Sequence, residues 1–144
     1  MNSVAGMELK LSHAFLEVQD QDEALAFYRD VLGLEVRNDV TMEDFRWVTV
    51  SPKAQPDVEI VLSPVGMMRP ADQPVLKELL AKGSMLGVIF TTDDVDATFE
   101  RIRAAGAEVL QEPIDQPYGV RDCSFRDPSG NPLRFSQELR TNVR

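Results

Sequence analysis

Residues 13–36 read HAFLEVQDQDEALAFYRDVLGLEV, a strand pattern joined directly to a helix pattern. The apolar run that begins this stretch is extended, which predicts a strand over 11–18. Asp20 follows as a helix N-cap, and apolar side chains then recur at the spacing of one helix face. Gly33 ends the pattern, because glycine readily adopts the left-handed conformation that terminates helices. We therefore predict a helix over 21–32.

The same arrangement occurs again 73 residues later in the chain. A shift of 73 places Asp20 on Asp93 and Gly33 on Gly106, so both ends of the first helix have a counterpart. Matching helix ends and a matching order of elements are typical of a duplicated module. We therefore predict that the chain is built from two similar halves.

The second helix is predicted over 94–105, with either Asp93 or Asp94 as its N-cap. Three strand-like runs follow each helix, and a bridge with a short amphipathic helix connects the halves. The predicted order is β-α-β-β-β, a helical bridge, and β-α-β-β-β. The other strands are predicted over 34–40, 45–50, 57–62, 86–91, 107–113, 118–128 and 131–137.

Composition excludes several classes of function for this chain of 144 residues. Its net charge of −9 repels phosphate backbones, so we expect no nucleic-acid partner. The single Cys123 rules out an intramolecular disulfide and a cysteine-rich zinc site, and His13 is the only histidine. No apolar run is long enough to span a membrane, and no signal peptide is recognisable, so we expect a cytoplasmic protein.

Three segments carry a resemblance to a known family. Residues 13–36, 93–109 and 118–135 resemble the vicinal oxygen chelate superfamily, which includes glyoxalase I, extradiol dioxygenases and bleomycin-resistance proteins. The resemblance implies an α+β fold of two βαβββ modules that form facing curled sheets around a central cavity. It also implies a homodimer. We expect one domain over 9–138, with module one at 9–64, a bridge at 65–84 and module two at 85–138.

Metalloenzymes of this family hold their ion with four side chains, two from each module. Carried over to this sequence, the four positions fall on His13, Val61, Gly87 or its neighbour Leu86, and Arg134. Of these only His13 is a ligand, although Glu59 lies two residues before Val61 on the same strand face. Because a catalytic divalent ion needs at least three protein ligands, we predict no metal site and no cofactor.

The resemblance and the alternation of strand side chains together predict which residues line the cavity. Some of these residues have a plain structural alternative: His13 bonded to a neighbour, Trp47 in the core, and Glu59 in an ion pair with Arg134. The predicted ligand-binding residues are His13, Phe15, Trp47, Glu59, Tyr118, Arg121 and Arg134.

We consider three functions from different classes. The first is a small-molecule-binding protein without an intact metal site that sequesters a toxic or antibiotic-like organic compound. The second is a lyase, isomerase or dioxygenase, either metal-dependent or using His13 or Glu59 as a general base. The third is a dimeric interaction or regulatory module whose cavity is vestigial and binds no ligand. Cys123 is predicted to be a buried apolar side chain and not a nucleophile.

Overall fold

The computed structural model describes residues 6–139. The first half of the chain follows the predicted order of elements. Its elements are β1 (His13–Val18), α1 (Gln21–Leu25), the π-helical turn η1 (Ala26–Val31), β2 (Glu35–Met42), β3 (Phe45–Ser51) and β4 (Glu59–Pro64). The four strands form one sheet in the order β1-β4-β3-β2, here called sheet A.

The second half repeats this arrangement after a bridge. The bridge holds the 3-10 turn η2 (Val65–Met67) and the helix α2 (Gln73–Ala81), and the module elements are β5 (Ile89–Thr91), α3 (Val95–Ala104), β6 (Glu108–Asp115), β7 (Val120–Arg126) and β8 (Pro132–Glu138). Its strands form sheet B in the order β5-β8-β7-β6. The predicted α+β fold of two βαβββ modules is therefore confirmed. No helix in the described residues is long and apolar enough to cross a membrane.

The two module helices begin with the same cap but differ in length. Asp20 accepts a hydrogen bond from the Glu23 backbone N–H at 2.8 Å, and Asp94, not Asp93, plays this part in the second module. Thirteen positions separate Asp20 from Gly33, whereas twelve separate Asp94 from Gly106. The π-helical turn η1 accommodates the extra residue, because its backbone bonds reach one residue further than those of an α-helix.

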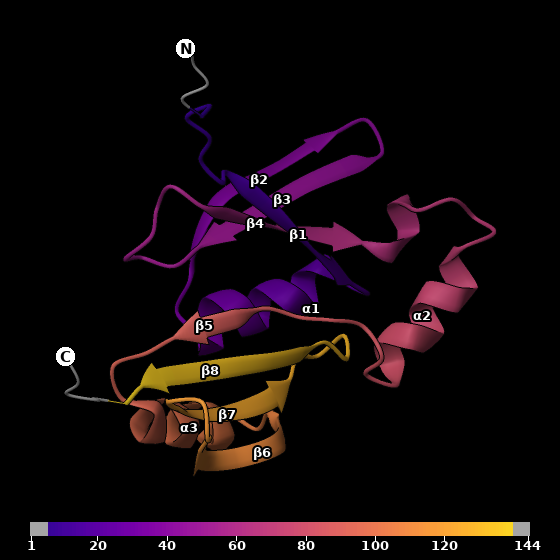
Figure 1. Cartoon of the computed structure of the whole chain (residues 1–144). Coiled ribbons are helices and arrows are strands. Elements are labelled where there is room, and N and C mark those ends of the chain that lie inside the picture. The colour runs from indigo at the N-terminus through magenta and orange to yellow at the C-terminus, as the bar shows by residue number, and fades with distance from the viewer. Residues whose placement is uncertain (1–5, 140–144) are drawn as a thin grey trace.

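The hydrophobic core lies between the modules. One cluster of buried side chains contains the inner face of sheet A, such as Leu16 and Leu62, together with Phe125 and Phe135 from sheet B. Figure 1 shows α1 between sheet A and the strands β5 and β8. The sheets therefore do not close around a cavity within one chain, because their helix-covered faces supply the shared core. The opposite face of each sheet points outward.

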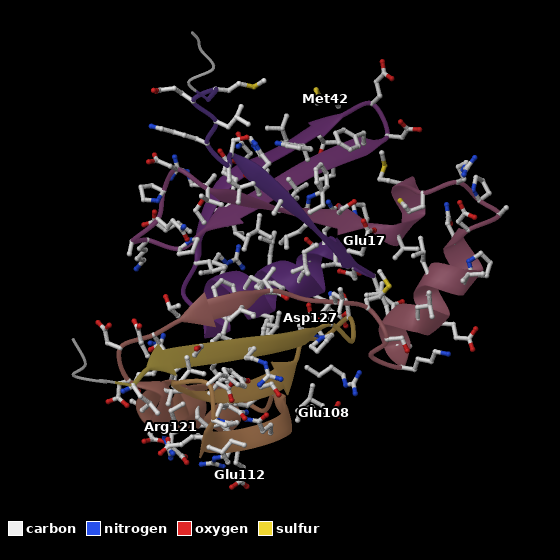
Figure 2. All side chains as sticks on the ribbon, viewed as in Figure 1. Glu17, Met42, Glu108, Glu112, Arg121 and Asp127 are labelled. Atoms are coloured by element: carbon white, nitrogen blue, oxygen red, sulfur yellow. The ribbon has the colours of Figure 1, made fainter. Side chains whose placement is uncertain are left out.

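A tight turn after β7 ties the two modules together. The Asp127 carboxylate accepts hydrogen bonds from the backbone N–H groups of Ser129, Gly130 and Asn131 at 2.8–2.9 Å. Its other oxygen accepts from the buried Tyr28 hydroxyl at 2.5 Å. Figure 2 shows Asp127 at the level where the modules meet. This polar junction fixes how the second module sits on the first helix.

Candidate functional site

An aromatic group covers part of the outward face of sheet A. Trp47 of β3 lies at its centre, with ring centroids 6.1 Å from His13, 6.4 Å from Phe15 and 6.1 Å from Phe45. Phe15 is 65% exposed, which is unusual for a phenylalanine in a strand. We call these four residues the aromatic group. It forms an apolar platform at the protein surface and does not belong to the core.

A carboxylate lies beside this platform, held by side chains of two neighbouring strands. Glu59 accepts a hydrogen bond from the Thr49 hydroxyl at 2.6 Å and from the Asn38 amide at 3.1 Å. These bonds favour the charged form, and the Thr49 hydroxyl contributes most to a lowered pKa of Glu59. The Glu59 carboxylate is therefore negatively charged at neutral pH. We call Asn38, Thr49 and Glu59 the Glu59 cluster.

His13 connects the aromatic group with the Glu59 cluster. Its Nδ1 lies 2.9 Å from the Ser12 hydroxyl, and its Nε2 lies 3.7 Å from a Glu59 oxygen. The imidazole is thus oriented between a hydroxyl and a carboxylate at the edge of the platform. This arrangement suits either a ligand contact or the transfer of a proton to or from a bound molecule.

Glu17 adds a second acid on the same strand face as His13 and Phe15. One of its carboxylate oxygens is buried and has no hydrogen-bond partner among the described residues. Burial raises the pKa of Glu17, and a hydrogen bond with Ser63 offsets part of this effect. Because a buried charge without a partner is costly, burial favours the neutral form of this carboxyl group.

Sheet B carries a similar polar cluster on its own outward face. The Arg134 guanidinium lies 3.2 Å from a carboxylate oxygen of Asp122 and donates to the Gln111 side-chain oxygen at 3.2 Å. Gln111 and Gln116 each donate to Asp122 at 2.9 Å. Burial opposes the ionisation of Asp122, but these amide donors and the Arg134 charge outweigh it, so its pKa is lowered. We call Gln111, Asp122 and Arg134 the Arg134 cluster.

The two clusters occupy equivalent places in the two modules. The 73-residue shift places Asn38 on Gln111 and Thr49 on Asp122. In the strand pairing His13 lies opposite Glu59, and in the same way Ile89 lies opposite Arg134. Module two therefore repeats the geometry of module one with different charges.

This pairing corrects two of the positions that the family resemblance implied. Glu59, and not Val61, is the counterpart of Arg134, since Val61 pairs with Thr49 as Ser136 pairs with Asp122. Gly87 precedes β5, where a Cβ atom would lie 1.8 Å from the Pro132 carbonyl oxygen, so no side chain fits there. Ile89, and not Gly87 or Leu86, takes the place that His13 holds in the first module.

The side chains at these positions do not fit a catalytic metal ion. His13 and Glu59 are suitable ligands, but Ile89 offers no donor and Arg134 carries a permanent positive charge. Across residues 6–139, no three His, Cys, Asp or Glu side chains lie close enough together to hold one ion. A set of two donors is below the three that catalytic sites use.

The structure brings some of the predicted site residues together and leaves others apart. His13, Phe15, Trp47 and Glu59 form one surface. Arg134 belongs to the other module, where its ion-pair partner is Asp122 and not Glu59.

Tyr118 and Arg121 join neither cluster. Tyr118 is 68% exposed in the turn after β6. Arg121 forms ion pairs with Asp96 at 3.1 Å and Asp115 at 3.0 Å, on the α3 side of sheet B. Figure 2 shows Arg121 far from Met42, which lies at the end of β2.

Sequence reasoning missed the polar partners that hold the two clusters. Asn38, Thr49, Gln111 and Asp122 are strand residues with no motif of their own. The available signal was the internal repeat, since the 73-residue shift overlays the polar Asn38 on Gln111 and the polar Thr49 on Asp122. Phe45 was also missed, although its alternation with Trp47 places both on one face.

Comparison with known proteins gives one family for almost the whole chain. Residues 10–135 match the model of the Glyoxalase/Bleomycin resistance protein/Dioxygenase superfamily. The structure is similar to the crystal structure of UcmS2, with 41% identity, a TM-score of 0.86, and coverage of 92% of this chain and 100% of that one. It is also similar to TnmS3, an antibiotic binding protein from Streptomyces sp. CB03234, with 30% identity, a TM-score of 0.73, and coverage of 94% and 99%. The protein YurT of Bacillus subtilis is 32% identical over 131 residues, which is 90% of this chain and all of YurT.

Proposed function

The chain belongs to the glyoxalase/bleomycin resistance protein/dioxygenase superfamily, and on that premise we propose that it binds and sequesters a small aromatic compound. The observation that carries this proposal is the aromatic group, in which three other rings surround Trp47 on an exposed sheet face. Flat aromatic ligands stack on such platforms. Sequestration needs no metal, which agrees with the donor set described above.

The charge beside the platform favours one kind of aromatic compound. Glu59 is ionised and lies next to the rings, so a cationic or hydrogen-bond-donating group on the ligand gains an attractive contact. The net charge of −9 acts in the same direction at longer range. TnmS3, which is an antibiotic binding protein, supports an antibiotic-like compound as the ligand.

We propose further that the binding pocket is completed by a second copy of the chain. The outward faces of sheets A and B both carry exposed apolar side chains, including Phe15 on β1 and Ile89 on β5. If sheet A of one copy faces sheet B of its partner, the Glu59 cluster of one copy meets the Arg134 cluster of the other. The Glu59 cluster is negative, whereas Asp122 offsets the charge of Arg134 in the other cluster, so no repulsion between like charges opposes this arrangement.

The single tryptophan makes the proposal directly testable. Because Trp47 is the only tryptophan, its fluorescence reports on the proposed site alone. We expect 9-aminoacridine, a planar cation, to quench the Trp47 fluorescence saturably. Anthracene-9-carboxylate, a planar anion, should bind at least tenfold more weakly. A tenfold difference in affinity corresponds to about 1.4 kcal/mol of binding free energy.

Variants distinguish the platform from a general surface effect. We expect Phe15→Ala and Glu59→Gln each to weaken 9-aminoacridine binding, and Val75→Ala, which changes an exposed apolar residue on α2, to leave it unchanged. Quenching that is unsaturable, or equal for the cation and the anion, would falsify the proposal.

One observation favours a second function, catalysis by proton transfer. His13 Nε2 lies 3.7 Å from a Glu59 carboxylate oxygen, so two groups that can act as general bases lie side by side next to the aromatic group. The test is turnover of the hemithioacetal of methylglyoxal and glutathione by the purified protein. Turnover that His13→Gln abolishes would support catalysis, whereas binding of the aromatic cation without turnover supports sequestration.

A further inference from the structure

A groove between the two modules has the composition of a second binding site. It lies where the end of the first helix and the loop after β3 meet β5 and α3, and it encloses about 350 Å³. This volume falls within the range of small-molecule pockets. Neither the aromatic group nor the Glu59 cluster lines the groove, so it is separate from the proposed aromatic site.

The floor of the groove is apolar and comes from both modules. Leu32 follows the first helix, whereas Ile102 belongs to α3 and Phe135 to β8. Phe90 stacks on Phe135 with ring centroids 5.5 Å apart and planes at 17°. Such a floor favours a hydrocarbon chain or an aryl ring, which loses contact with water when it binds there.

The mouth of the groove is positive although the protein as a whole is acidic. Lys53 and Arg101 line it, both are exposed, and neither lies within 4.0 Å of an acidic group in the described part of the chain. Among the other described arginines only Arg37 also lacks such a partner. Two uncompensated cations at one opening, in a chain of net charge −9, attract an anion.

Two hydroxyl groups complete the polar part of the lining. The Thr92 and Thr98 hydroxyls lie 2.8 Å apart and share one hydrogen bond. Both residues line the groove, so the pair also offers a hydroxyl donor to an anionic group. Cations and hydroxyls above an apolar floor match a molecule with one charged end.

We propose that the groove between the modules binds a small amphipathic carboxylate. The apolar body of the ligand lies on Leu32, Ile102 and Phe135, and its carboxylate lies between Lys53 and Arg101. The sign of the charge separates this site from the aromatic group, where a cation is favoured by Glu59. The two sites can therefore be tested independently, and neither proposal depends on the other.

The test uses three eight-carbon probes that differ only in the head group: octanoate, octanol and octylammonium. Each is titrated into the full chain labelled with ¹⁵N. We expect octanoate to shift the amide signals of Lys53, Thr92 and Arg101 saturably, with an affinity at least tenfold above that of octylammonium. The signals of Phe15 and Trp47 should stay in place.

A double variant tests whether Lys53 and Arg101 bind octanoate, and a second double variant with the same loss of charge serves as its control. We expect Lys53→Gln with Arg101→Gln to weaken octanoate binding at least tenfold. The control is Lys77→Gln with Arg37→Gln, which removes two positive charges elsewhere and should leave binding unchanged.

Three outcomes would overturn this proposal. They are equal shifts from octanoate and octylammonium, octanoate shifts at Phe15 and Trp47 in place of the groove, and wild-type binding by the Lys53/Arg101 double variant. A wild-type chain without saturable octanoate shifts would overturn the proposal as well, and a changed oligomeric state of the double variant would then identify the groove as an interface between copies. If the double variant fails to fold, the comparison of octanoate with octylammonium on the wild-type chain still tests the proposal.

Discussion

At the residue scale, the two modules differ most in the charge of their polar clusters. The contacts among Asn38, Thr49 and Glu59 are repeated among Gln111, Asp122 and Arg134, but Glu59 accepts hydrogen bonds from both of its partners, whereas the Arg134 guanidinium donates to Gln111 and pairs with Asp122. The first cluster carries a negative charge, whereas in the second the acid and the guanidinium neutralise each other. Equivalent positions of the two modules thus hold a net negative charge in one sheet and a neutral ion pair in the other.

The Thr49 hydroxyl is the main cause of the lowered pKa of Glu59. We therefore expect Thr49→Val to raise the pKa of Glu59 toward the ordinary glutamate value, as followed by NMR titration of the Glu59 side-chain carboxyl. Thr41→Val, on the exposed end of β2, is the control and should leave the Glu59 titration unchanged.

The same shift has a consequence for stability with a defined sign. The pKa of Glu59 is lower in the folded chain than in the unfolded chain, so its contribution is fully present above the unfolded pKa and is lost as the pH falls through the folded value. The difference in unfolding free energy between the wild type and Glu59→Gln should therefore shrink below about pH 4. A difference that stays constant from pH 7 to pH 3 would contradict this assignment.

The side-chain hydroxyl of Tyr28 in the first module bonds to Asp127 in the second. Its hydroxyl is buried and donates to Asp127 at 2.5 Å, and burial is the first cause that raises its pKa well above the ordinary tyrosine value. We expect Tyr28→Phe to lower the free energy of unfolding by about 2 kcal/mol, because it leaves a buried acceptor without this donor. Urea denaturation measures the loss, and Tyr118→Phe at an exposed position should change stability by less than about 0.5 kcal/mol.

At the element scale, the sequence predicted the helices well because their ends carry chemical signals. Asp20 and Gly33 mark the first helix, and the predicted helix over 21–32 corresponds to α1 with η1. The π-helical turn was not predicted, since one inserted residue leaves the apolar pattern almost unchanged. The extra residue lengthens the spacing from the cap to the glycine, which is thirteen positions in module one and twelve in module two.

Each predicted strand overlaps an observed one, although β5 begins at Ile89 and not at residue 86, and two of the four family positions were misplaced within the strands. Helix alignment placed the counterpart of His13 at Gly87, whereas strand pairing places it at Ile89. Seven positions separate His13 from the Asp20 cap, whereas five separate Ile89 from the Asp94 cap, so a single shift does not hold for both the strand and the helix. Pairing register is set by contacts between strands and is not encoded in the spacing along one strand.

Gly87 is constrained by this close packing of the segment before β5. A Cβ atom at this position would lie 1.8 Å from the Pro132 carbonyl oxygen, which is backbone and cannot rotate away. We expect Gly87→Ala to lower the free energy of unfolding by about 1–3 kcal/mol.

Gly66 is the matched control for this substitution. It has free space around its Cβ position, so Gly66→Ala should cost less than about 0.5 kcal/mol. Equal melting temperatures for the two alanine variants would show that the segment before β5 moves to make room.

At the scale of the whole molecule, the relation between the modules was the part that the sequence could not predict. Alternation along strands gives two faces for each sheet, but it does not say which faces meet. Buried side chains show that the helix-covered faces of both sheets share the core. Four of the seven predicted site residues therefore lie together on the outward face of sheet A, while Arg134 lies on the outward face of sheet B.

The outward face of sheet B gives a prediction about assembly. Ile89 is 68% exposed beside Arg134, in a position to contact sheet A of a second copy. We expect the wild type to sediment as a dimer and Ile89→Asp to shift it toward the monomer, because a charge in an apolar interface is costly.

Val75→Asp is the control, since it places the same charge on an exposed apolar position of α2. It should leave the sedimentation coefficient unchanged. A wild-type chain that remains monomeric at high micromolar concentration would rule out this mode of dimerisation.

Among residues 6–139, no strand of one half pairs with a strand of the other, because sheet A uses β1 to β4 and sheet B uses β5 to β8. A backbone cut near Met68, in the bridge before α2, would therefore interrupt no sheet. The two fragments could be produced separately and brought together by the core that they share. Such a split protein would turn fragment association into a signal, and fusing each fragment to half of a reporter enzyme would make that signal readable in living cells.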